Sequence, residues 1–112
     1  MKYHHMGIPT TREQEGEVYL EHLKMHVTDH ENNEFGIQWM RFDADCTLPR
    51  VVQTIPHVAF QVDNLEQALI GQEVIIEPNS PSSNVRVAFI LRNGAPWSSW
   101  STTSLSSFLA SR

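Results

Sequence analysis

Cysteine is nearly absent from the sequence, and clusters of basic residues and long hydrophobic runs are missing. The single cysteine, Cys46, excludes an internal disulfide and favours a reducing compartment such as the cytoplasm. The 8 Lys and Arg residues are scattered among 13 Asp and Glu residues, and the net charge of -5 argues against a nucleic-acid partner. No apolar run approaches the ~20 residues that cross a bilayer, and the first residues lack the apolar core of a signal peptide. We therefore expect no membrane partner.

What is present is an ordinary globular composition. The chain has 112 residues, of which 40% are hydrophobic and 19% are charged. A chain of this length and composition is typical of a single domain with its own core.

One short pattern occurs twice: a histidine, an apolar residue, a small residue and an apolar residue. The first copy, His-Met-Gly-Ile, begins at His5, and the second, His-Val-Ala-Phe, begins at His57. In a strand, successive side chains alternate between faces, so each histidine shares a face with the small residue, and His4 points away from His5. Two such strands from similar half-domains would bring both imidazoles to one cavity, which suggests a divalent-metal site. The alternative is two ordinary part-buried strand histidines.

The second half of the chain has the clearer pattern of elements. Residues 55–62 are predicted as a strand, 65–70 as a short helix that Asn64 caps and Gly71 ends, and 74–76 and 85–91 as two further strands. Residues 77–84 are predicted as a loop. Asn93-Gly94 predicts a hairpin turn that requires one more strand.

The first half fits the same plan less clearly. Residues 2–9 and 35–42 are predicted as strands, and 25–29 favours a strand because it contains Val and Thr. Residues 10–16 fit either a short helix or a loop, and 17–30 is ambiguous. Residues 43–54 form the connector. These patterns predict an α+β fold of two βαβββ-type modules, with module one at 1–48 and module two at 55–101.

Three segments resemble the vicinal oxygen chelate superfamily, which includes glyoxalase I, methylmalonyl-CoA epimerase, extradiol dioxygenases and bleomycin and fosfomycin resistance proteins. The first is His5-Met-Gly-Ile. The second is Pro56-His57-Val-Ala-Phe-Gln-Val-Asp followed by Asn64-Leu-Glu-Gln-Ala-Leu, and the third is Gly36-Ile-Gln38-Trp-Met-Arg-Phe. The resemblance covers residues 3 to 96 and implies paired βαβββ modules forming a cupped mixed sheet and, in many members, a homodimer.

The resemblance also implies a ligand set for a divalent ion, which would be Zn, Ni, Co, Mn or Fe. His5, Gln38 and His57 stand where the family places three metal ligands. The family's fourth ligand is commonly a Glu on the last strand, in a pattern like Gly-Ala-Pro-Val-Glu. This chain has Gly94-Ala-Pro-Trp-Ser98 instead, so Ser98 occupies the expected fourth-ligand position with a shorter and weaker donor.

Residues 97–112 form a second departure from the family. This tail contains seven Ser and no acid, and it lacks sustained strand alternation. For one choice of codons, losing a single base from a family-like Val-Glu-Phe-Leu-Glu ending produces Trp-Ser-Ser-Trp-Ser, which is the sequence at 97–101. We interpret the tail as a frameshift product with an altered last strand, which could still pair as an edge strand up to Ser101, with disorder or improvised packing beyond it. The alternative is a natural Ser-rich end.

Two functions follow from these observations. The first is a glyoxalase- or dioxygenase-like metal enzyme, a lyase, isomerase or dioxygenase that acts on a small oxygenated substrate and is impaired by loss of the fourth ligand. The second is a non-catalytic module that binds or sequesters a small ligand, as resistance proteins do. The missing acid favours the second.

Two other parts of the sequence are candidate sites. Glu21, His22 and His26 suggest a further metal set if the two histidines share a helix face, but exposed or structural roles are favoured because zinc sites need three or four ligands. Cys46 has no base near it in the sequence, so a catalytic thiol is not expected.

Overall fold

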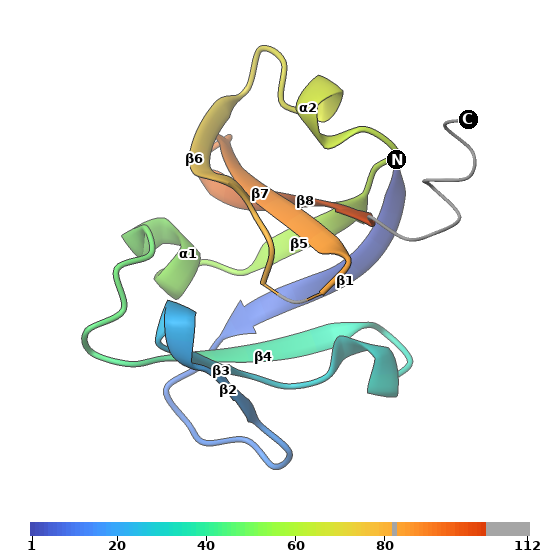
Figure 1. The fold of residues 1–112 in the computed structure, drawn as a ribbon. Coiled ribbons are helices and arrows are strands. Elements are labelled where there is room, and N and C mark those ends of the chain that lie inside the picture. Colours follow the sequence, from blue (N-terminus) through green and yellow to red (C-terminus); the bar gives the residue numbers. More distant parts are fainter. Residues whose placement is uncertain (82, 103–112) are drawn as a thin grey trace.

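A single mixed sheet organises the molecule. The computed structural model describes residues 1–81 and 83–102, and the predicted features of the tail at 103–112 lie outside the described residues. Eight strands lie in the order β2-β3-β4-β1-β5-β8-β7-β6, and Figure 1 shows that they curl into an open cup. The strands are β1 (Lys2–Pro9), β2 (Val18–Leu20), β3 (Met25–Val27), β4 (Ile37–Phe42), β5 (His57–Gln61), β6 (Glu73–Asn79), β7 (Val85–Arg92) and β8 (Ala95–Thr102). The predicted α+β fold with a cupped mixed sheet is confirmed.

The strand order reads as two copies of one arrangement that meet at the centre. In the first half, β1 pairs parallel with β4, β4 pairs antiparallel with β3, and β3 pairs antiparallel with β2. In the second half, β5 pairs parallel with β8, β8 antiparallel with β7, and β7 antiparallel with β6. The two halves join where β1 pairs antiparallel with β5. This symmetry places the two histidine strands side by side.

The helical elements are few and short. They are α1 (Arg50–Thr54), α2 (Leu65–Ala68) and two 3-10 turns, η1 (Glu21–Leu23) and η2 (His30–Asn32). The Asn64 side chain accepts a hydrogen bond from the Gln67 amide at 2.9 Å, as expected for an N-cap. Leu65 of α2 and Val52 of α1 are fully buried. None of the helices in the described part of the chain is long and apolar enough to cross a membrane.

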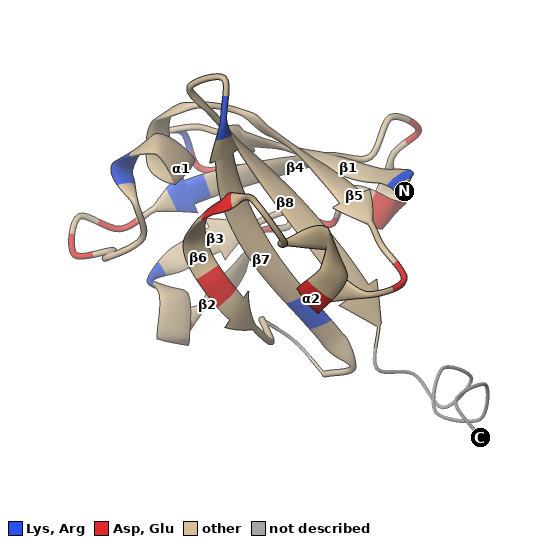
Figure 2. Ribbon diagram, turned by 90° about the horizontal axis from the view of Figure 1, so that it is seen from above, with Lys and Arg blue, Asp and Glu red and all other residues tan. Residues whose placement is uncertain are grey.

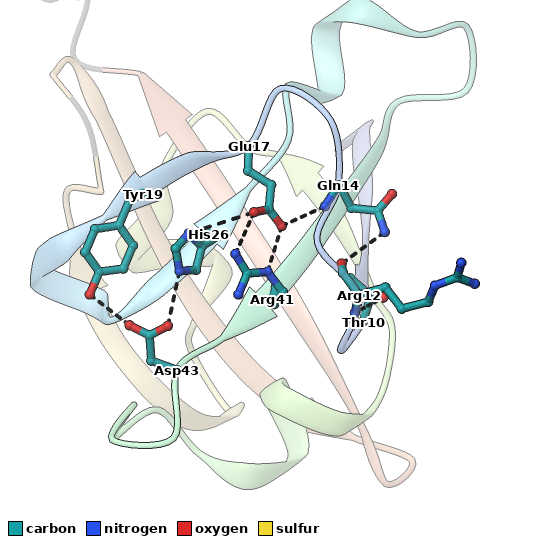
Figure 3. A network of polar contacts seen from close by, with 8 residues as sticks. All are labelled: Thr10, Arg12, Gln14, Glu17, Tyr19, His26, Arg41 and Asp43. Atoms are coloured by element: carbon teal, nitrogen blue, oxygen red, sulfur yellow. Dashed lines mark hydrogen bonds and ion pairs between the residues drawn. The ribbon is translucent and has the colours of Figure 1, made fainter.

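The first half has a loop where the second half has α2. Residues 10–17 contain no helix, which decides between the two alternatives left open by the sequence. Figure 3 shows how this loop is held: Arg41 of β4 donates two hydrogen bonds to the Glu17 carboxylate, at 2.9 and 2.7 Å. The same carboxylate accepts from the Gln14 amide at 3.1 Å. Polar contacts therefore replace the buried leucine of α2.

Three local expectations differ from the structure. The connector at 43–54 contains α1, whose buried Val52 packs it against the sheet. β6 extends to Asn79, so part of the predicted loop at 77–84 is strand. β8 lies between β5 and β7 and is a central strand, so the expectation of an edge strand at 97–101 is wrong. β8 forms because the Asn93-Gly94 turn, with φ of 56° and 73°, folds it back onto β7.

Charged residues are distributed over loops and strands, among them Arg41 on β4 and Arg86 on β7. Figure 2 shows acidic and basic positions interspersed along the ribbon.

Candidate functional site

The two repeated histidines face each other across the junction of the halves. In the register of β1 and β5, His5 lies opposite Ala59 and Gly7 lies opposite His57. Both histidines are buried, with 0% and 2% of their surface exposed, and their ring centroids are 5.8 Å apart. Each imidazole therefore lies over the small residue of the other copy.

Gly7 is required at its position by this packing. A Cβ added there would lie 2.2 Å from Cε1 of His57 and 2.6 Å from Sδ of Met40. Real side-chain atoms do not approach so closely, so the His57 ring occupies the space that a side chain at residue 7 would need.

Gln38 and Ser98 occupy equivalent places in the two halves. Gln38 of β4 lies opposite Gly7 in a parallel register, and Ser98 of β8 lies opposite Ala59 in a parallel register. Ser98 is 1% exposed, and its hydroxyl accepts a hydrogen bond from Nε1 of Trp100 at 3.0 Å. The Trp100 ring thus lies next to Ser98 on the concave face, and the Ser98 hydroxyl is already hydrogen-bonded to it.

The concave face encloses a small cavity of about 80 Å³. His5, Gln38 and His57 all line it, so the structure brings the three predicted ligand residues to one cavity; Ser98 is not part of the lining. The other lining residues are Leu20, Leu23, Met25, Val27, Met40, Leu48, Val52, Ile76, Asn79, Pro81, Val87, Phe89 and Trp100. Among the described residues, this lining contains no carboxylate and no cationic side chain.

Burial keeps the two central imidazoles uncharged. It lowers the pKa of His57 from 6.5 to about 4, and together with the neighbouring His30, His57 and His4 rings it lowers the pKa of His5 to about 2. Nε2 of His5 and Nδ1 of His57 are buried without a hydrogen-bond partner. Buried nitrogens with no partner are costly, so the arrangement fits a bound ligand that accepts lone pairs.

His4 lies beside His5, and the prediction that the two point to opposite faces is wrong. Their Nδ1 atoms are 2.7 Å apart, close enough for one ring to donate a hydrogen bond to the other. The cause is a bulge in β1: Tyr3 lies opposite Phe60 and His5 opposite Ala59, so His4 is an extra residue in the ladder. A bulge breaks the alternation on which the prediction relied.

His30 completes a cluster that the sequence did not reveal. One ring nitrogen each of His4, His5 and His30 lies within 4.8 Å of the others. His30 opens η2, which lies between β3 and β4, and its ring stacks against His5 with centroids 4.5 Å apart. The only available signal was histidine content, since nothing in the local pattern places residue 30 near the first strand.

The further metal set suggested by the sequence, which includes His22 and His26, does not come together in the structure. His22 is exposed in η1, whereas His26 lies on β3, so the two do not share a helix face. Nε2 of His26 is 3.1 Å from the Asp43 carboxylate, which also accepts from Tyr19 at 2.8 Å (Figure 3). Cys46 donates to the Leu23 carbonyl at 3.3 Å, a structural contact.

The donor set at the cavity is chemically suitable for a divalent ion. Two neutral imidazoles and one amide oxygen suit borderline ions such as Zn, Ni, Co or Fe(II), and three protein donors leave positions open for a substrate. Without a carboxylate, such a set holds an ion less strongly than a set that contains one.

Comparison with solved structures shows the same fold in other proteins. A hypothetical protein from Bacillus halodurans aligns with a TM-score of 0.67 at 15% identity, over 92% of this chain and 95% of its own. Methylmalonyl-CoA epimerase from Mycobacterium tuberculosis aligns with a TM-score of 0.65 at 16% identity, over 99% of this chain and 92% of its own. No protein-family model and no curated protein sequence matches the chain. The cupped sheet of this chain is thus also found in these two proteins, and the likeness concerns the fold.

Proposed function

We propose that this protein is a glyoxalase-like member of the vicinal oxygen chelate superfamily that binds a divalent ion through His5, Gln38 and His57 and acts on a small oxygenated molecule. The observation that carries the proposal is the cavity at the junction of the halves, where two buried imidazoles present unpartnered nitrogens beside Gln38. The matching register of the two halves supports it, because it repeats the same ligand positions on both sides.

The chain's own residues would perform three tasks. His5 and His57 supply neutral nitrogen donors, and Gln38 supplies an oxygen donor that adds no charge. The surrounding apolar side chains exclude water, which strengthens electrostatic interactions inside the cavity. When bound, the ion would hold vicinal oxygens of the substrate and stabilise negative charge that develops on them. A cavity of about 80 Å³ limits what fits beside the ion to a small group.

A specific observation favours the second candidate, a non-catalytic small-ligand-binding or sequestering module. Proton transfer at carbon needs a positioned base, and the described lining of the cavity has no carboxylate. The imidazoles that remain would serve as ligands. If this candidate is right, the protein binds its ligand without converting it.

The two candidates differ in one experiment. Protein purified without a histidine tag is stripped of metal, dialysed against Zn²⁺, Ni²⁺, Co²⁺ or Mn²⁺, and incubated in D₂O with 2-hydroxy acids, hemithioacetals of α-keto aldehydes and 2-methyl-branched acyl thioesters. An enzyme of the proposed type exchanges the substrate's α-proton in an ion-dependent way that His57→Ala abolishes. Ligand-induced thermal stabilisation without exchange supports the sequestering module. If the protein shows neither exchange nor thermal stabilisation, both candidates are contradicted.

We also propose a homodimer in the cytoplasm. Aromatic side chains of the first half, Phe35 at 70% exposure and Tyr3 at 47%, remain uncovered in the single chain. A second copy would cover them, and β2 and β6 are open edges for pairing. Light scattering at micromolar concentration should give twice the mass of one chain; a monomer would contradict the proposal. The single Cys46 agrees with a reducing compartment.

A further inference from the structure

We propose that His4, His5 and His30 form a second metal site, a three-imidazole site at the mouth of the cavity, for a borderline divalent ion such as Zn²⁺. It goes beyond the proposed function because two of its three ligands are not among the residues assigned to that function. The two sets share His5, so one chain holds one ion in one set or the other.

The geometry of the three rings carries the proposal. One nitrogen of each lies within 4.8 Å of the others, and the two Nδ1 atoms of His4 and His5 are 2.7 Å apart. Ligand nitrogens at about 2.0–2.1 Å from a tetrahedral ion lie about 3.3 Å from one another. Side-chain rotations that move each imidazole ring by about 1 Å would therefore bring the three nitrogens to the spacing of a ligand set.

Unpartnered nitrogens point to a missing ligand at this place. His5 is fully buried, and its Nε2 has no hydrogen-bond partner; Nε2 of His30 is also buried without one. Natural proteins rarely leave such atoms unpaired, and an ion between the three rings would give Nε2 of His30 a partner.

The cluster is built by the fold, and three features hold it in place. The bulge in β1 turns His4 toward the concave face. The loop that carries His30 is closed by Asn33, whose side chain accepts from the Ile37 amide at 2.7 Å and donates to the Ile37 carbonyl at 2.9 Å. The indole of Trp100 stacks on His4, with ring centroids 5.1 Å apart and planes 15° apart. Ligand rings are thus oriented before an ion arrives.

An entry path and nearby negative charge also favour the site. His4 and His30 line a second, outer pocket of about 330 Å³, which shares Gln38 and Trp100 with the inner cavity. The carboxylate of Glu31 lies 4.0 Å from Nε2 of His30 and lines the same pocket. An ion can approach through this pocket, and Glu31 attracts it and can fill a fourth position.

Donor chemistry predicts which ions choose which set. Three imidazoles suit Zn²⁺, Ni²⁺ and Co²⁺, whereas the set with the Gln38 amide oxygen has one nitrogen fewer. We expect these ions to prefer the three-imidazole site, and Mn²⁺, which accepts oxygen donors more readily, to occupy the set of the proposed function that contains Gln38.

The test uses Zn²⁺ alone and the full chain. Zn²⁺ affinity is measured by competition with a chromophoric chelator for the wild type and for His4→Ala, His30→Ala and His57→Ala, with His22→Ala as the control because His22 is exposed and outside the cluster. His4→Ala and His30→Ala should each weaken binding at least about tenfold. His22→Ala should not change it. Circular dichroism confirms that each variant is folded, and His30→Gln replaces His30→Ala if that variant is not.

Co²⁺ gives an independent readout. With three imidazoles and a low coordination number, Co²⁺ should show intense visible absorption bands that disappear in His30→Ala and persist in His57→Ala. If His57→Ala loses binding while His4→Ala and His30→Ala do not, the inference is overturned and the proposed function stands. If none of the three variants weakens binding, both are overturned.

Discussion

The two halves of the molecule share one plan and differ in what fixes their first connection. In the second half, β5 leads into α2, and the buried Leu65 packs that helix on the sheet. In the first half, β1 leads into a loop that Arg41 holds through Glu17. The halves therefore preserve the strand register at the cavity while replacing an apolar anchor with a polar one. Each half contributes its first strand, β1 or β5, to the junction where the histidines lie.

The apolar anchor should be the stronger one. Leu65→Ala should cost about 2–5 kcal/mol of unfolding free energy, because it removes a fully buried side chain and leaves a cavity. Urea unfolding measures this cost. Ile70→Ala is the control: Ile70 is 75% exposed, so its truncation should stay within about 0.5 kcal/mol. Equal costs for the two variants would mean that α2 is not anchored as described.

The junction of β1 and β5 should tolerate substitution less well at Gly7 than at Ala59. Gly7→Ala should destabilise by about 1–3 kcal/mol, because its Cβ meets the His57 ring. Ala59→Gly removes a side chain opposite His5 and should cost only about 0.5–1 kcal/mol, the usual effect of glycine in a strand. Thermal and urea unfolding compare the two. A Gly7→Ala variant as stable as the wild type would show that the ring does not fill this space.

The Arg41–Glu17 contact, which is the polar anchor of the first half, should affect how stability depends on acid pH. Hydrogen bonds from Arg41 lower the pKa of Glu17 to about 2 from its ordinary value of 4.5. A carboxyl whose pKa is lower in the folded state stabilises the fold above the unfolded pKa and stops doing so as the pH falls through the folded pKa. The wild type should therefore lose more stability than Glu17→Gln between pH 4.5 and 2, measured as melting temperature.

The second half supplies the control for that experiment. Glu66 of α2 also pairs with an arginine, Arg86, at 2.6 Å, but its side chain is 65% exposed and makes one such contact. Exposed pairs contribute little, so Glu66→Gln should change the acid dependence less than Glu17→Gln does. The buried histidines titrate in every variant and cancel in the comparison. A larger effect for Glu66→Gln would contradict the assigned anchor.

The sequence predicted the parts of the site that depend on strand periodicity. His5, Gln38 and His57 reach one cavity because alternation and the repeated small residue determine which face each side chain takes. His4 could not be predicted, since a bulge depends on how β1 pairs with β5. His30 could not be predicted either, because its contact with the first strand is set by the chain path between β3 and β4. The stacking of Trp100 on His4 follows from the central place of β8, which the sequence did not predict either.

The altered last strand remains the sharpest difference between the halves. Ser98 occupies the place in β8 that Gln38 occupies in β4, yet its hydroxyl pairs with Trp100. If residues 97–112 are a frameshift product, as we propose, the carboxylate was lost with the reading frame. Its return should then improve binding of an ion that prefers oxygen donors.

Mn²⁺ affinity of Ser98→Glu against the wild type tests the account most directly. Carboxylate oxygen suits Mn²⁺, and Ser98→Glu would add one at the junction, where the described lining of the cavity has none. Ser99→Glu is the matched control, because strand alternation directs residue 99 to the opposite face. We predict that Ser98→Glu binds Mn²⁺ at least about tenfold more tightly than the wild type does. We also predict that Mn²⁺ raises the melting temperature of Ser98→Glu, and that Ser99→Glu shows neither change. Equal Mn²⁺ affinity in the wild type and in Ser98→Glu would contradict a metal site at the junction of the two halves.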